Sequence, residues 1–114
     1  MTNCIFCKII ADEALADIVY RDETVTAFRD INPAAPIHIL IVPNKHIHSV
    51  NEITSEDEAV VGFMHTIAKK IAQNEGIAQN GYRLVINTGS DGGQIVFHLH
   101  MHLMGGKKLV IHKY

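Results

Sequence analysis

The alternation of hydrophobic and polar positions along the chain predicts one long helix. Apolar residues recur every three or four positions in residues 60–72, which is the spacing of one face of an α-helix. Ser55 to Glu58 has the sequence of a capping box, and Gly76 follows the apolar stretch as a C-terminal cap. We therefore predict a helix over residues 55–75.

Short runs rich in β-branched and aromatic residues predict strands. These runs are residues 17–20, 24–29, 37–42, 82–87 and 95–104. The first two are separated by Asp22-Glu23 and are typical of a hairpin, and the run 37–42 suits a central strand buried on both faces. Residues 5–10 fit a short opening helix. Strands joined by short loops, with helices set apart, predict an α+β domain with an antiparallel sheet.

Length and composition exclude several classes of protein. The chain has 114 residues, 47% of them hydrophobic, which suits a single domain over residues 1–114. No apolar stretch reaches the ~18 residues of a membrane span, and the net charge of -2 comes from interspersed signs, so we expect neither a membrane nor long nucleic acid as a partner. The absence of a leader-like start and the close pair Cys4 and Cys7 indicate a reducing cytoplasm.

Three histidines alternate along the last predicted strand. Strand side chains alternate between faces, so His98, His100 and His102 share one face, and the intervening apolar residues fill the other. Three buried imidazoles need hydrogen-bond partners or a metal. Two chemistries remain open at this point: the histidines chelate a divalent metal, or one of them is a nucleophile that its neighbours position. A solvated strand face that happens to be rich in histidine is the third reading.

The loop before this strand favours nucleophilic chemistry on phosphorus. Asp91-Gly92-Gly93-Gln94 allows close approach of its backbone to an anion, and consecutive N–H groups there could cradle a phosphate. By itself such a loop is more often a plain turn.

The residues from Gly92 to Gly106 resemble the signature of the histidine triad (HIT) superfamily, His-φ-His-φ-His-φ-φ, where φ is apolar. The Gly-Gly pair that follows is similar to the Hint branch, the purine nucleoside phosphoramidases. The resemblance also covers residues 5–10, 27–33, 35–43 and 81–87. It implies the HIT fold, with a five-stranded antiparallel sheet, one long and one short helix, and a homodimer with an extended ten-stranded sheet. The predicted helix 55–75 and the strand before it are the expected contact surfaces.

The resemblance implies a hydrolase that cleaves the P–N bond of purine nucleoside 5′-phosphoramidates through a covalent nucleotidyl-histidine. The middle histidine of the family attacks the α-phosphorus, and here that is His100. His102 would donate to the phosphoryl oxygens, His38 matches a fourth histidine that supports the triad, and His98 is its first member. No cofactor is implied for catalysis.

The nucleotide contacts are implied position by position. Asp30 matches the carboxylate that accepts both ribose hydroxyls. Apolar walls around the purine are implied for Ile5, Phe6, Ile9, Phe28, Ile31 and Leu40, although for Leu40 plain core packing is favoured. Asn87, Gly93 and Gln94 match contacts to phosphate and ribose oxygens, and Ile95 is also expected among the nucleotide-binding residues.

The chain also departs from the family pattern. Ile95 stands where part of the family has a serine that hydrogen-bonds the leaving-group nitrogen, so protonation of the leaving group would rest on His102, His38 or water. Ala14 and Leu15 differ near the base pocket. The tail 107–114 is unusual, and Lys108, His112 or Tyr114 could contact leaving groups.

A structural zinc is a further implication of the resemblance. Cys4-x-x-Cys7 is a zinc half-site, and part of the superfamily completes it with a histidine after Pro-x-Lys, here His46, and with the first triad histidine, His98. His48 is an alternative ligand. The competing reading is two reduced cysteines in the first helix.

Three rival functions are kept open. One is a dinucleoside polyphosphate hydrolase of a sister HIT branch, which usually carries Pro-Arg where this chain has Gly105-Gly106. Another is a nucleotide-binding regulatory protein with vestigial activity, against which the intact triad argues. The third is a metal-binding strand protein without phosphorus chemistry.

Overall fold

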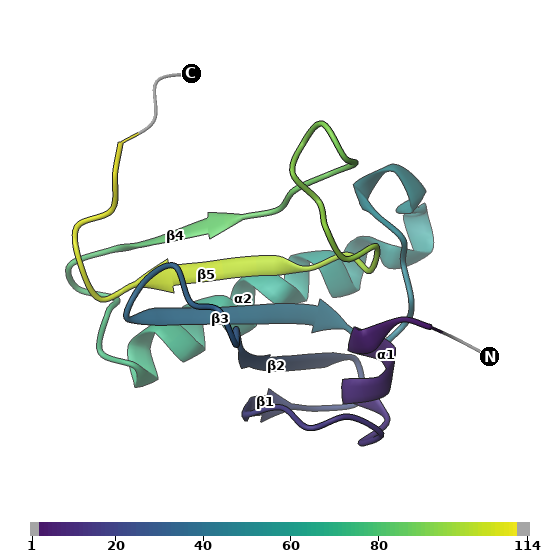
Figure 1. Cartoon of the computed structure of the whole chain (residues 1–114), viewed down its shortest axis with the longest axis horizontal. Helices are drawn as coiled ribbons and strands as arrows, with labels where there is room; N and C mark the ends of the chain where they lie inside the picture. Colours follow the sequence, from purple (N-terminus) through teal and green to yellow (C-terminus); the bar gives the residue numbers. More distant parts are fainter. Residues whose placement is uncertain (1–2, 112–114) are drawn as a thin grey trace.

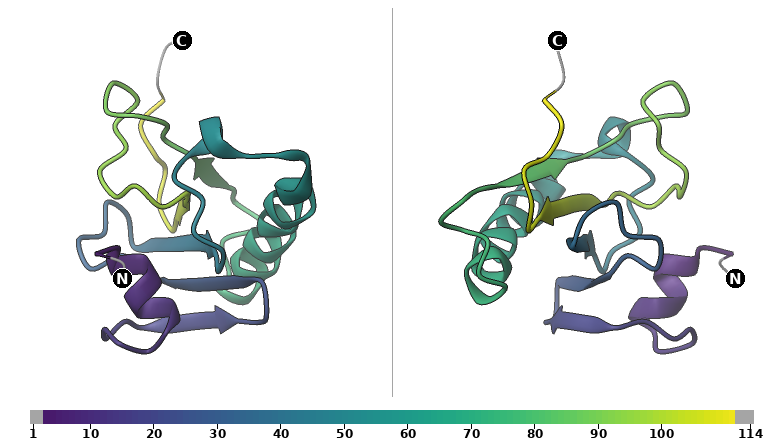
Figure 2. Two further views of the ribbon diagram at one scale, coloured as in Figure 1. Left: turned by 90° about the vertical axis from the view of Figure 1, so that its right-hand side faces the viewer. Right: turned by 60° about the vertical axis from the view of Figure 1, so that its left-hand side comes forward.

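The computed structural model describes residues 3–111, and its strands form one antiparallel sheet of order β1-β2-β3-β5-β4 (Figure 1). The strands are β1 (Ile18–Arg21), β2 (Val25–Arg29), β3 (Ile37–Pro43), β4 (Tyr82–Val85) and β5 (Met101–Gly105). The long helix α2 (Glu58–Asn74) covers one face, and the short helix α1 (Ile5–Ile10) lies on the other (Figure 2). The predicted α+β class and antiparallel sheet are confirmed.

The central strand β3 is apolar throughout because both of its faces are buried. Ile39 and Ile41 pack into the cluster beneath α2, whereas Leu40 and Val42 pack against α1 on the opposite face. Alternation along a strand thus builds two cores from one continuous apolar run.

Strand β5 carries the same alternation beside β3. Met101 and Leu103 are fully buried in the cluster beneath α2. His102 lies between them in sequence and pairs with Leu40 in the β3–β5 register, so its side chain is on the α1 face of the sheet. The strand therefore delivers its histidine to the side opposite the long helix.

The predicted strand over residues 95–104 is wrong in its first half. The ladder with β3 begins only at the pair Ile41 and Met101. Beyond it, Pro43 has no N–H to donate, and its carbonyl accepts from the His98 ring instead. The backbone N–H of Leu99 donates to Ile47, outside the sheet. Residues 95–100 are consequently irregular, and β4 likewise ends at Val85, before the predicted Asn87.

The start of the long helix also differs from the prediction. A 3₁₀ turn over Ser55–Asp57 precedes α2, and the capping box is made by Thr54 with Asp57, not by Ser55 with Glu58. The buried carboxylate of Asp57 also accepts from Lys45 Nζ at 2.7 Å. At the other end Gly76 has a φ of 76°, which confirms the expected cap.

The position of β3 corrects one expectation about assembly. The strand before the long helix lies between β2 and β5, so it cannot pair with a second chain. The edges of the sheet are β1 and β4. Among residues 3–111, no helix combines the length and the apolar character that crossing a bilayer requires.

The packing of α2 yields a first prediction. Ile67 is fully buried beneath the sheet, whereas its neighbour Thr66 is exposed. We expect Ile67→Ala to lower the free energy of unfolding by about 2–5 kcal/mol and Thr66→Ala to change it by less than about 0.5 kcal/mol. Urea denaturation of both variants measures the difference, and equal losses would contradict the assigned orientation of the helix.

Candidate active site

A pocket of about 510 Å³ opens on the α1 face of the sheet. Its apolar walls include all the residues predicted to surround the purine, namely Ile5, Phe6, Ile9, Phe28, Ile31 and Leu40. Leu40 lines the pocket and also packs in the core beneath α1, where it is only 6% exposed. Asp30, His100 and His102 supply polar groups to the same pocket.

His100 is held by the backbone of its own segment. Its Nδ1 lies 2.7 Å from the carbonyl oxygen of His98, which can only accept, so the ring proton belongs to Nδ1. Burial lowers the pKa of His100 below its ordinary value, which favours the neutral ring. In that state Nε2 keeps its lone pair, and the ring of Phe6 packs edge-on at 5.1 Å between centroids. The imidazole is therefore arranged as a nucleophile.

His98 is turned away from the pocket. It is fully buried, and its Nε2 donates to the carbonyl of Pro43 at 2.8 Å. The bare Nδ1 then faces the thiols of Cys4 and Cys7, at 3.4 and 3.6 Å. Burial lowers the pKa of His98 to about 4, so this ring is neutral at physiological pH. The backbone carbonyl of His98 thus accepts a hydrogen bond from His100, while the ring of His98 contacts the two cysteines.

His38 lies behind the third triad histidine. Its Nε2 is 2.9 Å from Nδ1 of His102 and 3.5 Å from Oδ2 of Asp30. His38 itself does not line the pocket. Burial, together with repulsion from His100 and His38, lowers the pKa of His102 to about 4. His102 is consequently a neutral ring that borders the pocket.

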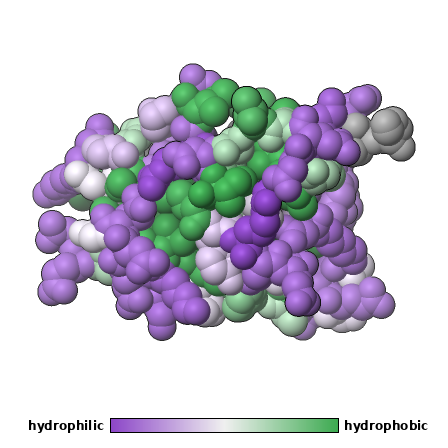
Figure 3. Space-filling view, turned by 90° about the horizontal axis from the view of Figure 1, so that it is seen from below, coloured by the Kyte–Doolittle hydropathy of each residue, from purple (hydrophilic) through white to green (hydrophobic). Residues whose placement is uncertain are grey.

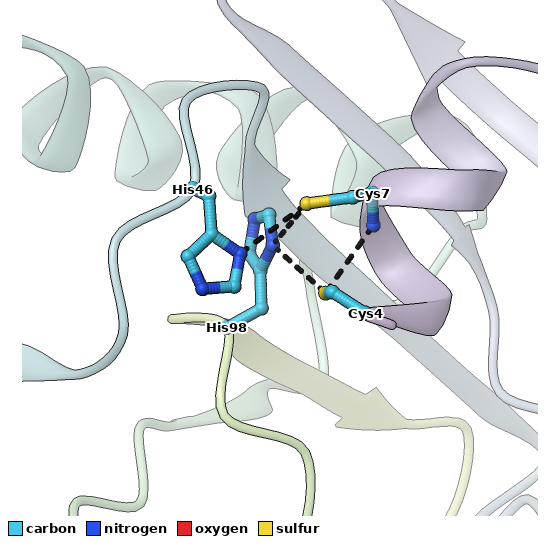
Figure 4. Close-up of side chains that lie close together, drawn as sticks. All are labelled: Cys4, Cys7, His46 and His98. Carbon is cyan, nitrogen blue, oxygen red and sulfur yellow. Dashed lines mark hydrogen bonds between the residues drawn. The ribbon is translucent and has the colours of Figure 1, made fainter. Parts of the chain in front are cut away.

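Two cysteines and two histidines meet at the start of α1 (Figure 4). The ligand atoms of Cys4, Cys7, His46 and His98 all lie within 4.8 Å of one another. Cys4 is the N-cap of α1 and Cys7 lies one turn later, so both thiols project to the same side. His48 is not part of the group, because its ring stacks on Phe97 at 4.9 Å.

The distances in this cluster fit a zinc ion. Nδ1 of His46 is 3.2 Å from Sγ of Cys7, close to the two thiol distances of His98. Tetrahedral zinc with bonds of about 2.3 Å to sulfur and 2.0–2.1 Å to nitrogen separates such ligand atoms by roughly 3.6 Å. The bond from His98 to the Pro43 carbonyl also resembles the outer-shell bond that orients a metal-binding histidine.

Comparison with known proteins identifies the family. Residues 11–109 match the model of the HIT domain. The chain belongs to the HIT family. The purine nucleoside phosphoramidase of Escherichia coli (strain K12) is 58% identical over 105 residues, which are 92% of this chain and 88% of that protein.

Solved structures of HIT proteins share the fold. A histidine triad protein from Clostridium difficile is 46% identical and superposes with a TM-score of 0.96, covering 99% of this chain and 98% of its own. A HIT family hydrolase from Legionella pneumophila Philadelphia 1 is 47% identical with a TM-score of 0.93, covering 95% and 96%. The predicted family and fold are thereby confirmed.

In the loop before β5, the side-chain amides of Asn87 and Gln94 are hydrogen-bonded to the protein itself. Nδ2 of Asn87 donates to the carbonyl of Gly92 at 2.8 Å. The amide of Gln94 is buried, where it accepts from Gly89 N–H and donates to the carbonyls of His48 and Val96. Neither side chain lines the pocket, whereas Gly93 does. These amides therefore hold the loop together, and Gly93 is the residue of the loop's Asp91–Gln94 stretch that borders the pocket.

The mouth of the pocket is apolar and open. Leu15, Ile31 and Ile95 are 100%, 88% and 87% exposed, and all three line the pocket. Seen from below, the molecule shows hydrophobic surface gathered between hydrophilic margins (Figure 3). Ile95 is therefore placed where water reaches the site, and it offers no hydrogen bond to a leaving group.

The C-terminal tail does not reach the pocket within the described residues. Lys108 lines a separate hollow with Gly76 and Asn80, and the carbonyl of Val110 accepts a hydrogen bond from Arg83 on β4. His112 and Tyr114 lie outside the described residues. Two contributors to the site escaped prediction, the Pro43 carbonyl and the Ala34 N–H that meets His38. Both are backbone groups, which have no signature in the sequence.

The low pKa of His102 predicts a pH-dependent stability. The folded pKa of about 4 lies below the ordinary 6.5, so between these values the unfolded chain binds more protons. The stabilisation is complete above about pH 6.5 and is lost as the pH falls towards 4. We expect His102→Gln to lose less free energy of unfolding than the wild type from about pH 6.5 to 4.5. Denaturant titrations test this, with the exposed His65→Gln expected to follow the wild type; an equally steep loss in His102→Gln would contradict it.

Proposed function

We propose that this HIT protein hydrolyses purine nucleoside 5′-phosphoramidates, breaking the P–N bond between a purine nucleotide and an amine. The observation that carries the proposal is the orientation of the His100 ring. Its Nδ1 donates to the carbonyl oxygen of His98, with 2.7 Å between nitrogen and oxygen, and its unprotonated Nε2 keeps a lone pair beside the pocket. The 58% identity to a protein named purine nucleoside phosphoramidase supports the same substrate class.

The reaction divides into two transfers. In the first, the lone pair of His100 Nε2 forms a bond to the α-phosphorus, and the P–N bond breaks with its electron pair leaving on the amine nitrogen. In the second, water attacks phosphorus and the bond between phosphorus and His100 Nε2 breaks, with its electron pair returning to the ring. The attacking water releases a proton to solvent, and the nucleotide leaves the neutral ring. His102 donates to the phosphoryl oxygens, where negative charge develops.

Binding of the nucleotide follows from the lining of the pocket. The rings of Phe6 and Phe28 and the aliphatic side chains around them offer apolar surface to the purine. The carboxylate of Asp30 can accept from both ribose hydroxyls. Gly93 lines the same pocket, and without a side chain it allows the phosphate to approach the backbone closely.

Loss of the nucleophile tests the proposal. We expect His100→Ala to lower kcat/KM for an AMP-amine substrate by roughly three orders of magnitude or more, because its first transfer has no attacking nitrogen. Wild type and the exposed His65→Ala should hydrolyse this substrate faster than diadenosine tetraphosphate. Rapid quenching followed by mass spectrometry should find the nucleotide on His100, and equal turnover in His100→Ala would overturn the assignment.

We further propose that Cys4, Cys7, His46 and His98 hold one structural zinc ion. The ion would tie the start of α1 to the segment before β5, and through His98 it would steady the carbonyl that holds His100. It would supply folding energy and no chemistry to the reaction. Thiolate ligands suit a reducing compartment, which supports a cytoplasmic location.

Removing one ligand tests the zinc site. We expect the purified wild type to contain one zinc ion per chain by elemental analysis and Cys7→Ser to contain much less. The Tm of the variant should fall by roughly 10 °C, which corresponds to about 2 kcal/mol for a domain of this size. His48→Ala, which alters the neighbouring histidine outside the cluster, should keep its zinc. A wild type without stoichiometric zinc would exclude the site.

We also propose a homodimer formed through β4. This strand ends the sheet order, so pairing of β4 with its copy would join the two sheets into ten strands. Light scattering at micromolar concentration should then give twice the mass of the chain, and a monomer would exclude the pairing.

A further inference from the structure

The backbone N–H of Ala34 decides where the proton of His38 lies. Ala34 is in the loop after β2, and its N–H donates to Nδ1 of His38 at 2.9 Å. An amide N–H can only donate, so Nδ1 must present a lone pair. The proton of the neutral His38 ring is therefore on Nε2.

The position of the proton on His38 determines the position of the proton on His102. Nε2 of His38 lies 2.9 Å from Nδ1 of His102 and 3.5 Å from Oδ2 of Asp30. Since Nε2 of His38 donates, Nδ1 of His102 accepts, and the single proton of neutral His102 is on its Nε2. A cationic His102 would also carry a proton on Nδ1, and this N–H would meet the Nε2–H of His38 head-on within a partly buried contact. Burial acts in the same direction, because it lowers the pKa of His102 to about 4.

We infer that Ala34 and His38 are positioning residues that make His102 a fixed hydrogen-bond donor, and that His102 does not transfer a proton to the leaving group. The inference rests on the proposed function for its consequence in catalysis, whereas the positions of the protons are independent of any activity.

Because His102 cannot give up its proton, the leaving amine must take its proton from another source. His100 Nε2 bonds to phosphorus, the P–N bond breaks, and the amine nitrogen that takes the electron pair needs one proton. If His102 gave up its Nε2 proton, it would become an anion, because its only proton source is His38, which would then become an anion in turn. The proton comes from solvent water, and the exposed Ile31 and Ile95 show that the pocket mouth is open to it.

The proton on His38 Nε2 also decides whether a second cluster of possible metal ligands can bind a metal. Asp30, His38 and His102 bring ligand atoms within 4.8 Å of one another. A metal would need the lone pair of His38 Nε2, which carries the proton that Ala34 assigns to it. The group is accordingly a hydrogen-bond chain and not a metal centre.

Nuclear magnetic resonance of the full chain, with ¹⁵N-labelled histidine at pH 7, tests the proton positions directly. We expect His38 and His102 to be protonated at Nε2 and His100 at Nδ1. A His102 protonated at Nδ1, or at both nitrogens, would overturn the inference whatever the activity of the protein.

Two substitutions at His38 test its hydrogen bonds to Ala34 and to His102 one at a time. His38→Gln keeps an N–H donor near the position of Nε2, whereas His38→Asn keeps an acceptor near Nδ1 and loses that donor. We expect His102 to stay protonated at Nε2 in the Gln variant and to populate both tautomers in the Asn variant. An unchanged His102 tautomer in the Asn variant would show that His38 does not set it, and would overturn the inference.

Kinetics test the role of His102. His102→Gln keeps an N–H donor that cannot transfer a proton, and we expect its kcat for an AMP-amine substrate within about tenfold of the wild type. His102→Leu has no donor, and its kcat should fall by about 10²–10³-fold. A loss in the Gln variant as large as in the Leu variant would overturn the inference. A wild type without turnover would refute the proposed function and leave the resonance result standing.

Discussion

The bond from His100 Nδ1 to the carbonyl of His98 depends on a break in regular structure. In a continued β-ladder the carbonyls of this segment would be directed at the neighbouring strand, but the ladder between β3 and β5 starts only at Met101. Pro43 contributes to the break because it cannot donate to a ladder. The irregular residues 95–100 can therefore bring the carbonyl of His98 to the ring of His100 two residues later. The end of the sheet thus provides the local hydrogen bond that leaves a bare nitrogen beside the pocket.

His98 connects this arrangement to the rest of the molecule. Its ring is fixed at one nitrogen by the carbonyl of Pro43 and faces the thiols of Cys4 and Cys7 at the other. The same residue thus links β3, the start of α1 and the nucleophile. Because all these groups are buried or partly buried, a displacement of α1 would be transmitted to the carbonyl that orients His100.

Most of the fold was predictable from the periodicity of the sequence, since the cores on both faces of β3 produce a continuous apolar run and α2 has a single apolar stripe. The alternation correctly separated His102 from Met101 and Leu103, but His98 and His100 precede β5, and His98 is buried away from the pocket that His100 and His102 line. The prediction failed where contacts distant in sequence decide the outcome. Ile47 takes the N–H of Leu99 out of the sheet. The prediction of the capping box failed for a local reason, because Thr54 and Asp57 form the same kind of pattern one residue earlier.

In the candidate site, side-chain identities were predictable and backbone roles were not. The residues that line the pocket carry recognisable chemistry, but Pro43, Ala34 and the carbonyl of His98 act through peptide groups that every sequence contains. These three groups determine the tautomers of the histidine rings. Fixed, neutral tautomers suit a buried site, because burying charged imidazoles side by side would cost desolvation and mutual repulsion. Burial keeps His98, His100 and His102 neutral, whereas the backbone groups direct one ring nitrogen each of His98, His100 and His38 to a defined partner. The three histidines of the triad thereby acquire three different functions.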